Sequence, residues 1–149
     1  MKLAEALQLR ADLNTKIAQL KQRIYNNAVV QEGEEPAEDP KELIRELDQS
    51  IDELETLIQK INLANCRTIV EGKTLTEWIA IKDCLKIRIE AYQEIVSRSS
   101  NLCGRMTRTE IKTLATLSAK DIQKKADSLS AELRKTDNLI QQTNWTVEL

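Results

Sequence analysis

Apolar residues recur every three or four positions along most of the chain, which is the spacing of one face of an α-helix. Polar segments separate four such stretches, and we predict helices over residues 3–30, 40–66, 75–97 and 119–143. The alternation is most regular in the second stretch, through Ile44, Leu47, Ile51, Leu54, Ile58 and Ile61, as in a coiled-coil seam. The pattern predicts an all-α fold, an up-and-down four-helix bundle or antiparallel coiled coil, in a single domain over residues 1–149.

The segments between the predicted helices carry their own signals. Gly33 and Pro36 oppose helix in an acidic loop, and Asp39 before Pro40 is a strong helix start because aspartate caps and proline suits the first helical position. Over residues 66–74 a β-branched run meets a Glu-Gly turn, which predicts a hairpin-like element. Over residues 105–117 we predict a second short irregular or β-like segment.

The third predicted helix has more apolar positions than one buried stripe needs. They are Leu75, Trp78, Ile79, Ile81, Cys84, Leu85, Ile87, Ile89, Tyr92, Ile95 and Val96. Such a helix is either central in the monomer or shares a second face with another subunit. We therefore expect a homo-oligomer.

Charge and composition narrow the range of partners. The chain has 22 basic and 24 acidic residues, mostly interspersed, so no strong field draws it to nucleic acid or to an anionic membrane. The first residues contain no apolar targeting region, and no stretch approaches the roughly 18 apolar residues of a membrane span. We expect a cytoplasmic protein with no nucleic-acid or membrane partner.

The sequence offers little catalytic chemistry. Without histidine there is no Ser-His or Cys-His pair, and the three cysteines, Cys66, Cys84 and Cys103, form no CxxC motif. No glycine-rich phosphate loop is present, and the acidic run lacks the spacing of a calcium-binding loop. We expect no catalytic, cofactor-binding or metal-binding residues, no cofactor and no enzymatic activity.

One end of the predicted bundle is a candidate interaction site. In an up-and-down bundle the loop after the first helix lies at the same end as the segment after the third. The first supplies Glu34, Glu35 and Glu38, and the second supplies Arg105, Arg108 and Lys112. Either the acidic loop docks on the basic segment, or both are solvated loops.

Several segments resemble a family of small bacterial proteins, some of which are labelled septicolysin. The resemblance lies in residues 1–13, the loop 31–40, the segment Thr74 to Glu77 and the closing Asn144 to Thr146. It implies no site residues, but the label implies a membrane-active toxin. The leading interpretation is a non-enzymatic protein that acts through self-association or protein contacts. The alternatives are the septicolysin-like toxin and a small-ligand or metal binder using the irregular bundle end.

Overall fold

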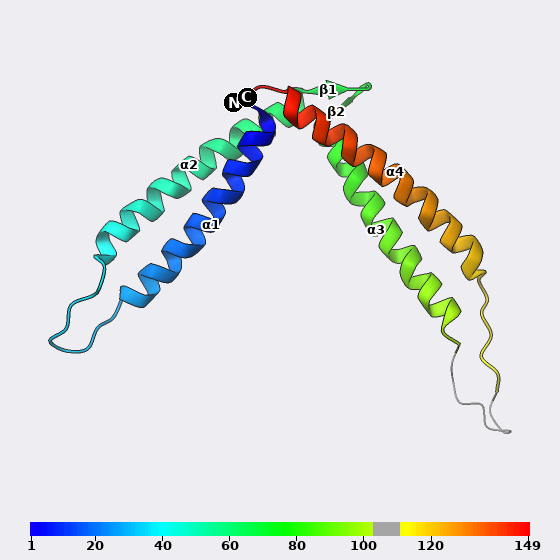
Figure 1. Cartoon of the computed structure of the whole chain (residues 1–149), viewed down its shortest axis with the longest axis horizontal. Helices are drawn as coiled ribbons and strands as arrows, with labels where there is room; N and C mark the ends of the chain where they lie inside the picture. The colour runs from blue at the N-terminus through cyan, green and yellow to red at the C-terminus, as the bar shows by residue number, and fades with distance from the viewer. Residues whose placement is uncertain (103–110) are drawn as a thin grey trace. The chain divides into compact units, whose positions relative to one another are not determined.

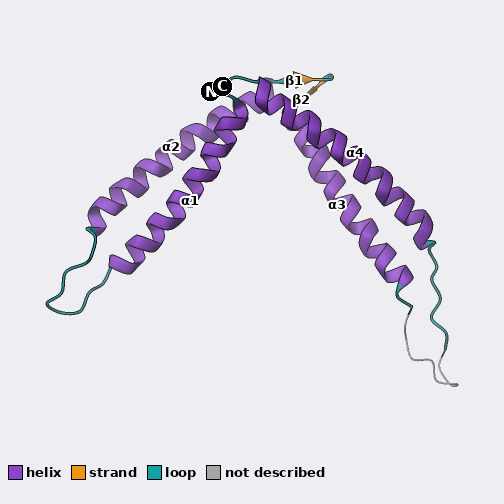
Figure 2. Ribbon diagram, in the orientation of Figure 1, coloured by secondary structure: helices purple, strands orange, loops and turns teal. Residues whose placement is uncertain are grey.

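The computed structural model describes residues 1–102 and 111–149 and contains four long helices (Figure 1). They are α1 (Leu3–Asn27), α2 (Pro40–Arg67), α3 (Leu75–Ser100) and α4 (Ala119–Thr146), with two short strands between α2 and α3. Figure 2 shows how little of the described chain is strand. The predicted all-α fold class is confirmed.

The chain divides into two compact units, which are described separately. The first comprises residues 1–74 and 142–149, and the second comprises residues 75–141. The long helix α4 therefore contributes its last five residues, 142–146, to the first unit. That residues 1–149 form a single domain stays a prediction.

In the first unit, α1 and α2 form an antiparallel helical hairpin (Figure 1). Buried apolar side chains line the inner faces: Leu3, Ala6, Leu13 and Leu20 from α1, and Leu43, Leu57 and Ile61 from α2. An ion pair between Lys16 Nζ and Glu46 Oε1, 3.0 Å long, joins the two helices. Burial of these apolar side chains supplies most of the stability of such a pair.

The inner face of α2 differs from the predicted seam. Leu43, Ser50 and Leu57, spaced by seven residues, are at most 5% exposed, whereas Ile44 and Ile51 are 45% and 43% exposed. The prediction that every residue of the Ile44–Ile61 series lies in the seam is therefore wrong. Helix α2 carries two adjacent apolar rows, and the row one residue earlier faces α1.

A β-hairpin follows α2. Strand β1 (Ile69–Val70) pairs antiparallel with β2 (Lys73–Thr74), with Val70 opposite Lys73. The two turn residues, Glu71 and Gly72, have φ values of 49° and 79°. Positive φ at both central residues is the requirement of the tight hairpin turn whose twist matches the strands. The hairpin predicted over residues 66–74 is confirmed.

In the second unit, α3 pairs with the first part of α4 (Figure 1). Buried side chains include Leu85 and Ile89 of α3 and Ala126, Thr136 and Ile140 of α4. Lys82 and Asp137 form an ion pair between the two helices. Its hydrogen bond lowers the pKa of the Asp137 carboxyl.

The predicted helix boundaries hold to within a turn. Lys41 N donates to Asp39 Oδ1 at 2.9 Å, so Asp39 caps α2 with Pro40 at its first position. Asp121 N donates to Ser118 Oγ at 3.3 Å at the start of α4. No strand occurs among the described residues 111–117, and residues 105–110 of that predicted segment lie outside the described part.

Candidate functional site

The acidic loop between α1 and α2 is fastened to the end of α1. The guanidinium of Arg23 donates to both carboxylate oxygens of Glu38, with Nε to Oε2 at 3.1 Å. Glu38 N donates to Asn27 Oδ1 at 3.0 Å, and Asn27 Nδ2 donates to Arg23 O at 2.9 Å. Three side chains therefore hold the last part of the loop against its own helical hairpin.

This ion pair shifts the titration of both members. The hydrogen bond from Arg23 lowers the pKa of the Glu38 carboxyl, and the same bond raises the pKa of Arg23. Of the predicted acidic set, Glu38 is thus partnered within its own hairpin. Docking of the loop on the basic segment stays a prediction.

The other two predicted acids lie around a shallow polar hollow. Glu34 and Glu35 line a depression of about 520 Å³ together with Asn26, Asn27 and Gln31. Glu34 N donates to Gln31 O at 3.0 Å in a turn whose Gly33 has φ of 89°. Within residues 1–102 and 111–149, no group of three or more carboxylates or thiols is arranged to hold a metal ion.

We predict that Glu38→Gln will loosen the acidic loop at neutral pH. The variant loses the carboxylate charge and one of the two oxygens that accept from Arg23, so hydrogen exchange of a peptide spanning residues 28–39 should become several-fold faster. Because the folded-state pKa of Glu38 is lowered, the protection should be complete above the ordinary glutamate pKa and disappear as the pH falls through the folded value.

Glu35→Gln is the matched control for this prediction. It removes the same charge from the same loop, but no hydrogen bond or ion pair joins the Glu35 side chain to another described residue. Equal acceleration in the two variants would show that loop charge, and not the Arg23–Glu38 pair, restrains the loop.

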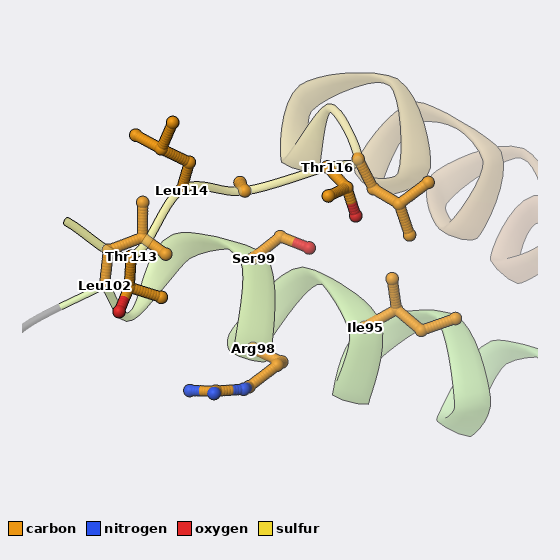
Figure 3. Close-up of a pocket in the computed structure, with 9 residues that line it drawn as sticks. Ile95, Arg98, Ser99, Leu102, Thr113, Leu114 and Thr116 are labelled. Carbon is orange, nitrogen blue, oxygen red and sulfur yellow. The ribbon is translucent and has the colours of Figure 1, made fainter. Parts of the chain in front are cut away.

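The predicted basic set is only partly described. Lys112 is exposed, while Arg105 and Arg108 lie outside the described residues. Beside Lys112, residues 113–117 and the end of α3 enclose a pocket of about 290 Å³. Ile95 and Ser99 point toward the extended segment, and the Arg98 side chain runs along the other side of the helix (Figure 3).

The described residues that line this pocket are mostly apolar. Leu102, Leu114 and Leu117 supply apolar surface, and Ser99 and Thr116 supply hydroxyl groups. Among the described residues that line it, none is a carboxylate or thiol that could act as a general base or nucleophile. Its composition fits a small, mostly apolar molecule with one polar group.

A third feature was not predicted from the sequence: the last residues of the chain pair with the first. Leu3 N donates to Val147 O at 2.9 Å, and Leu149 N donates to Met1 O at 3.0 Å. The Glu148 carboxylate forms ion pairs with Lys2 Nζ at 2.7 Å and with the Met1 ammonium at 3.0 Å. The hydrogen bonds from Lys2 and the Met1 ammonium lower the pKa of Glu148. Together with the backbone hydrogen bonds, they tie the end of α4 to the start of α1.

Comparison with known proteins gives the chain a family. The model of a family of unknown function (DUF6847) matches residues 10–149. The chain belongs to this family. No curated protein matches it.

The family resemblance extends to a solved structure. The chain is similar to a functionally unknown conserved protein from Corynebacterium diphtheriae, with 37% sequence identity and a TM-score of 0.93. The match covers 100% of this chain and 98% of that one. Neither the DUF6847 family nor this neighbour carries the septicolysin label, so that part of the resemblance stays a prediction.

Proposed function

We propose that this DUF6847 member is a non-enzymatic, cytoplasmic helical protein that acts through self-association. Apolar residues on the outer faces of its helices carry the proposal. Ile44, Ile51 and Ile58 of α2 are 45%, 43% and 37% exposed, and Ile87 of α3 is 67% exposed. Heptad-spaced isoleucines are the pattern of a helix that packs against another helix.

The outer face of α3 agrees with the surplus of apolar positions predicted there. Ala80, Cys84, Ile87 and Ala91 are exposed and follow one another at spacings of four, three and four residues. That stripe lies opposite the buried Leu85 and Ile89. Within the described part of the chain, it is therefore a second apolar surface that another copy could contact.

Sedimentation velocity over a concentration range tests the proposal. We expect a reversible shift from monomer to a larger species between about 1 and about 100 µM, the range of an interface of moderate affinity. A strict monomer throughout that range would refute self-association.

The pocket at the end of α3 supports a second candidate, small-ligand binding. A thermal-shift screen with nucleotides, divalent metals and small amphiphiles tests it, and a hit should weaken when Ser99 is replaced by leucine to fill the pocket.

None of the described helices is sufficiently long and apolar to span a lipid bilayer. The septicolysin-like alternative gains no support from the family or from the solved neighbour.

A further inference from the structure

The α1–α2 hairpin carries two rows of apolar residues outside its core, one of large side chains and one of small side chains. The large row is Ile44, Ile51 and Ile58 on α2, and the small row is Ala4, Ala11 and Ala18 on α1. Both rows have a spacing of seven residues, so each forms a line along its helix. Ala11 and Ala18 are exposed, as are all three isoleucines.

Both rows lie on the same side of the hairpin. Ile44 directly follows the buried Leu43, and Ala18 directly follows the half-buried Ile17. One residue is a rotation of about 100° in the same sense on every α-helix. Because α1 and α2 run in opposite directions and face each other, rotations in the same sense carry both rows to one side of the hairpin, called here the Ala–Ile face. The alanine row is turned farther from α2 than the isoleucine row is from α1, because Ala11 and Ala18 lie two residues before the buried Leu13 and Leu20.

The register of the hairpin sets the two rows at matching heights. The ion pair between Lys16 and Glu46 marks residues that lie level across the two helices. Counting in opposite directions from that pair brings Ala18 level with Ile44 and Ala11 level with Ile51. A second hairpin turned over onto this face would therefore meet each isoleucine with an alanine.

The charges of the two helices favour one orientation of such a second hairpin. Helix α1 has four basic and two acidic residues, a net charge of +2. Helix α2 has four basic and six acidic residues, a net charge of −2. Placing α1 on α2 of the second copy joins opposite charges, whereas placing α2 on α2 joins like charges.

We propose that two copies of the chain pair through their Ala–Ile faces, with α1 of each packed antiparallel on α2 of the other about a two-fold axis parallel to the helices. This inference rests on the proposed self-association and specifies its surface. Small side chains opposite large ones allow close approach, and every neighbouring helix in the resulting four-helix assembly is antiparallel. The arrangement is isologous, as closed dimers require.

Ile51→Lys tests the surface, Ile87→Lys tests the competing outer face of α3, and Ile69→Lys, at an isoleucine of β1 that is 70% exposed and lies outside both surfaces, is the matched control. We expect Ile51→Lys to raise the dimer dissociation constant at least about tenfold, since a lysine would be buried at the centre of the face. Ile69→Lys should leave dimerisation unchanged, and Ile87→Lys should do the same because the pairing proposed here does not use α3. If only Ile87→Lys dissociates the dimer, this surface is wrong although self-association stands, whereas a monomeric wild type refutes both.

A crosslinking experiment tests the register independently of any loss of stability. Ala11→Cys and Ile51→Cys are made separately in a background in which Cys66, Cys84 and Cys103 are serine. A short thiol crosslinker should join the two variants efficiently when they are mixed. Each variant by itself should form few crosslinked dimers. Crosslinking of Ile51→Cys to itself in preference to the mixture would overturn the proposed pairing of α1 with α2.

Discussion

Replacing Leu57 by alanine is expected to lower the free energy of unfolding by about 2–5 kcal/mol. Leu57 is 5% exposed on the inner face of α2, where it packs with the buried residues of α1. The change removes buried apolar atoms and leaves a cavity, which α1 and α2 can fill only partly by moving closer together. Urea denaturation followed by circular dichroism measures the loss, at a protein concentration at which the variant and the wild type have the same oligomeric state.

Leu63→Ala is the matched control because it makes the same substitution six residues later in the same helix. Leu63 is 49% exposed, so truncating it should cost about 1 kcal/mol or less. Equal losses in the two variants would mean that the inner face of α2 has been assigned to the wrong row. The pair therefore tests the finding that the row containing Leu57, absent from the predicted seam, faces α1.

The helix starts were predictable because their chemistry is local. Asp39 and Pro40 are adjacent, and the cap hydrogen bond runs only two residues forward, from Lys41 to Asp39. The cap at Ser118 spans three residues. Propensity and capping act within one helical turn, so the sequence alone contains the information. The same holds for the Glu71-Gly72 turn, because its positive φ values are a property of the two turn residues themselves.

The choice between the two rows of α2 was not predictable from α2 alone. Leu43 and Leu57 are as apolar as Ile44 and Ile58, and each row has the seven-residue spacing of a seam. What decides is how the helix rotates to pack its neighbour, which depends on residues of α1 distant in sequence. Sequence periodicity identified an amphipathic helix correctly and included the buried Ile61, but it took the exposed row of Ile44, Ile51 and Ile58 for part of the core.

The candidate acidic site shows the same limit. Glu38 was grouped with Glu34 and Glu35 because they are close in the sequence, but its partner Arg23 is 15 residues away on α1. A bidentate contact of this kind depends on where the loop returns to the helix, which a charge pattern does not specify. The pairing of Lys2 with Glu148, at opposite ends of the chain, was beyond any local pattern.

Replacing Ser50 by leucine is expected to lower the free energy of unfolding by about 1–3 kcal/mol, although it makes the inner row of α2 uniformly apolar. Ser50 is 2% exposed and lies between Leu43 and Leu57 in that row. Its hydroxyl donates to Glu46 O at 2.8 Å, so the buried polar group is satisfied within its own helix. The small side chain leaves no room for a leucine unless α1 moves away.

Two comparisons separate size from polarity at this position. Ser50→Ala keeps the volume small and removes only a hydrogen bond to the helix backbone, so it should be neutral or slightly stabilising. Ser128→Leu, at an exposed position within α4, should change the free energy of unfolding by about 0.5 kcal/mol or less. If Ser50→Leu instead stabilised the protein, the helices would be separated widely enough at Ser50 for its small size to be unimportant. In paired helices, a polar or small residue within an apolar row fixes the register of the pair at some cost in stability. Stabilisation by Ser50→Leu would mean that Ser50 does not fix the register of α1 and α2.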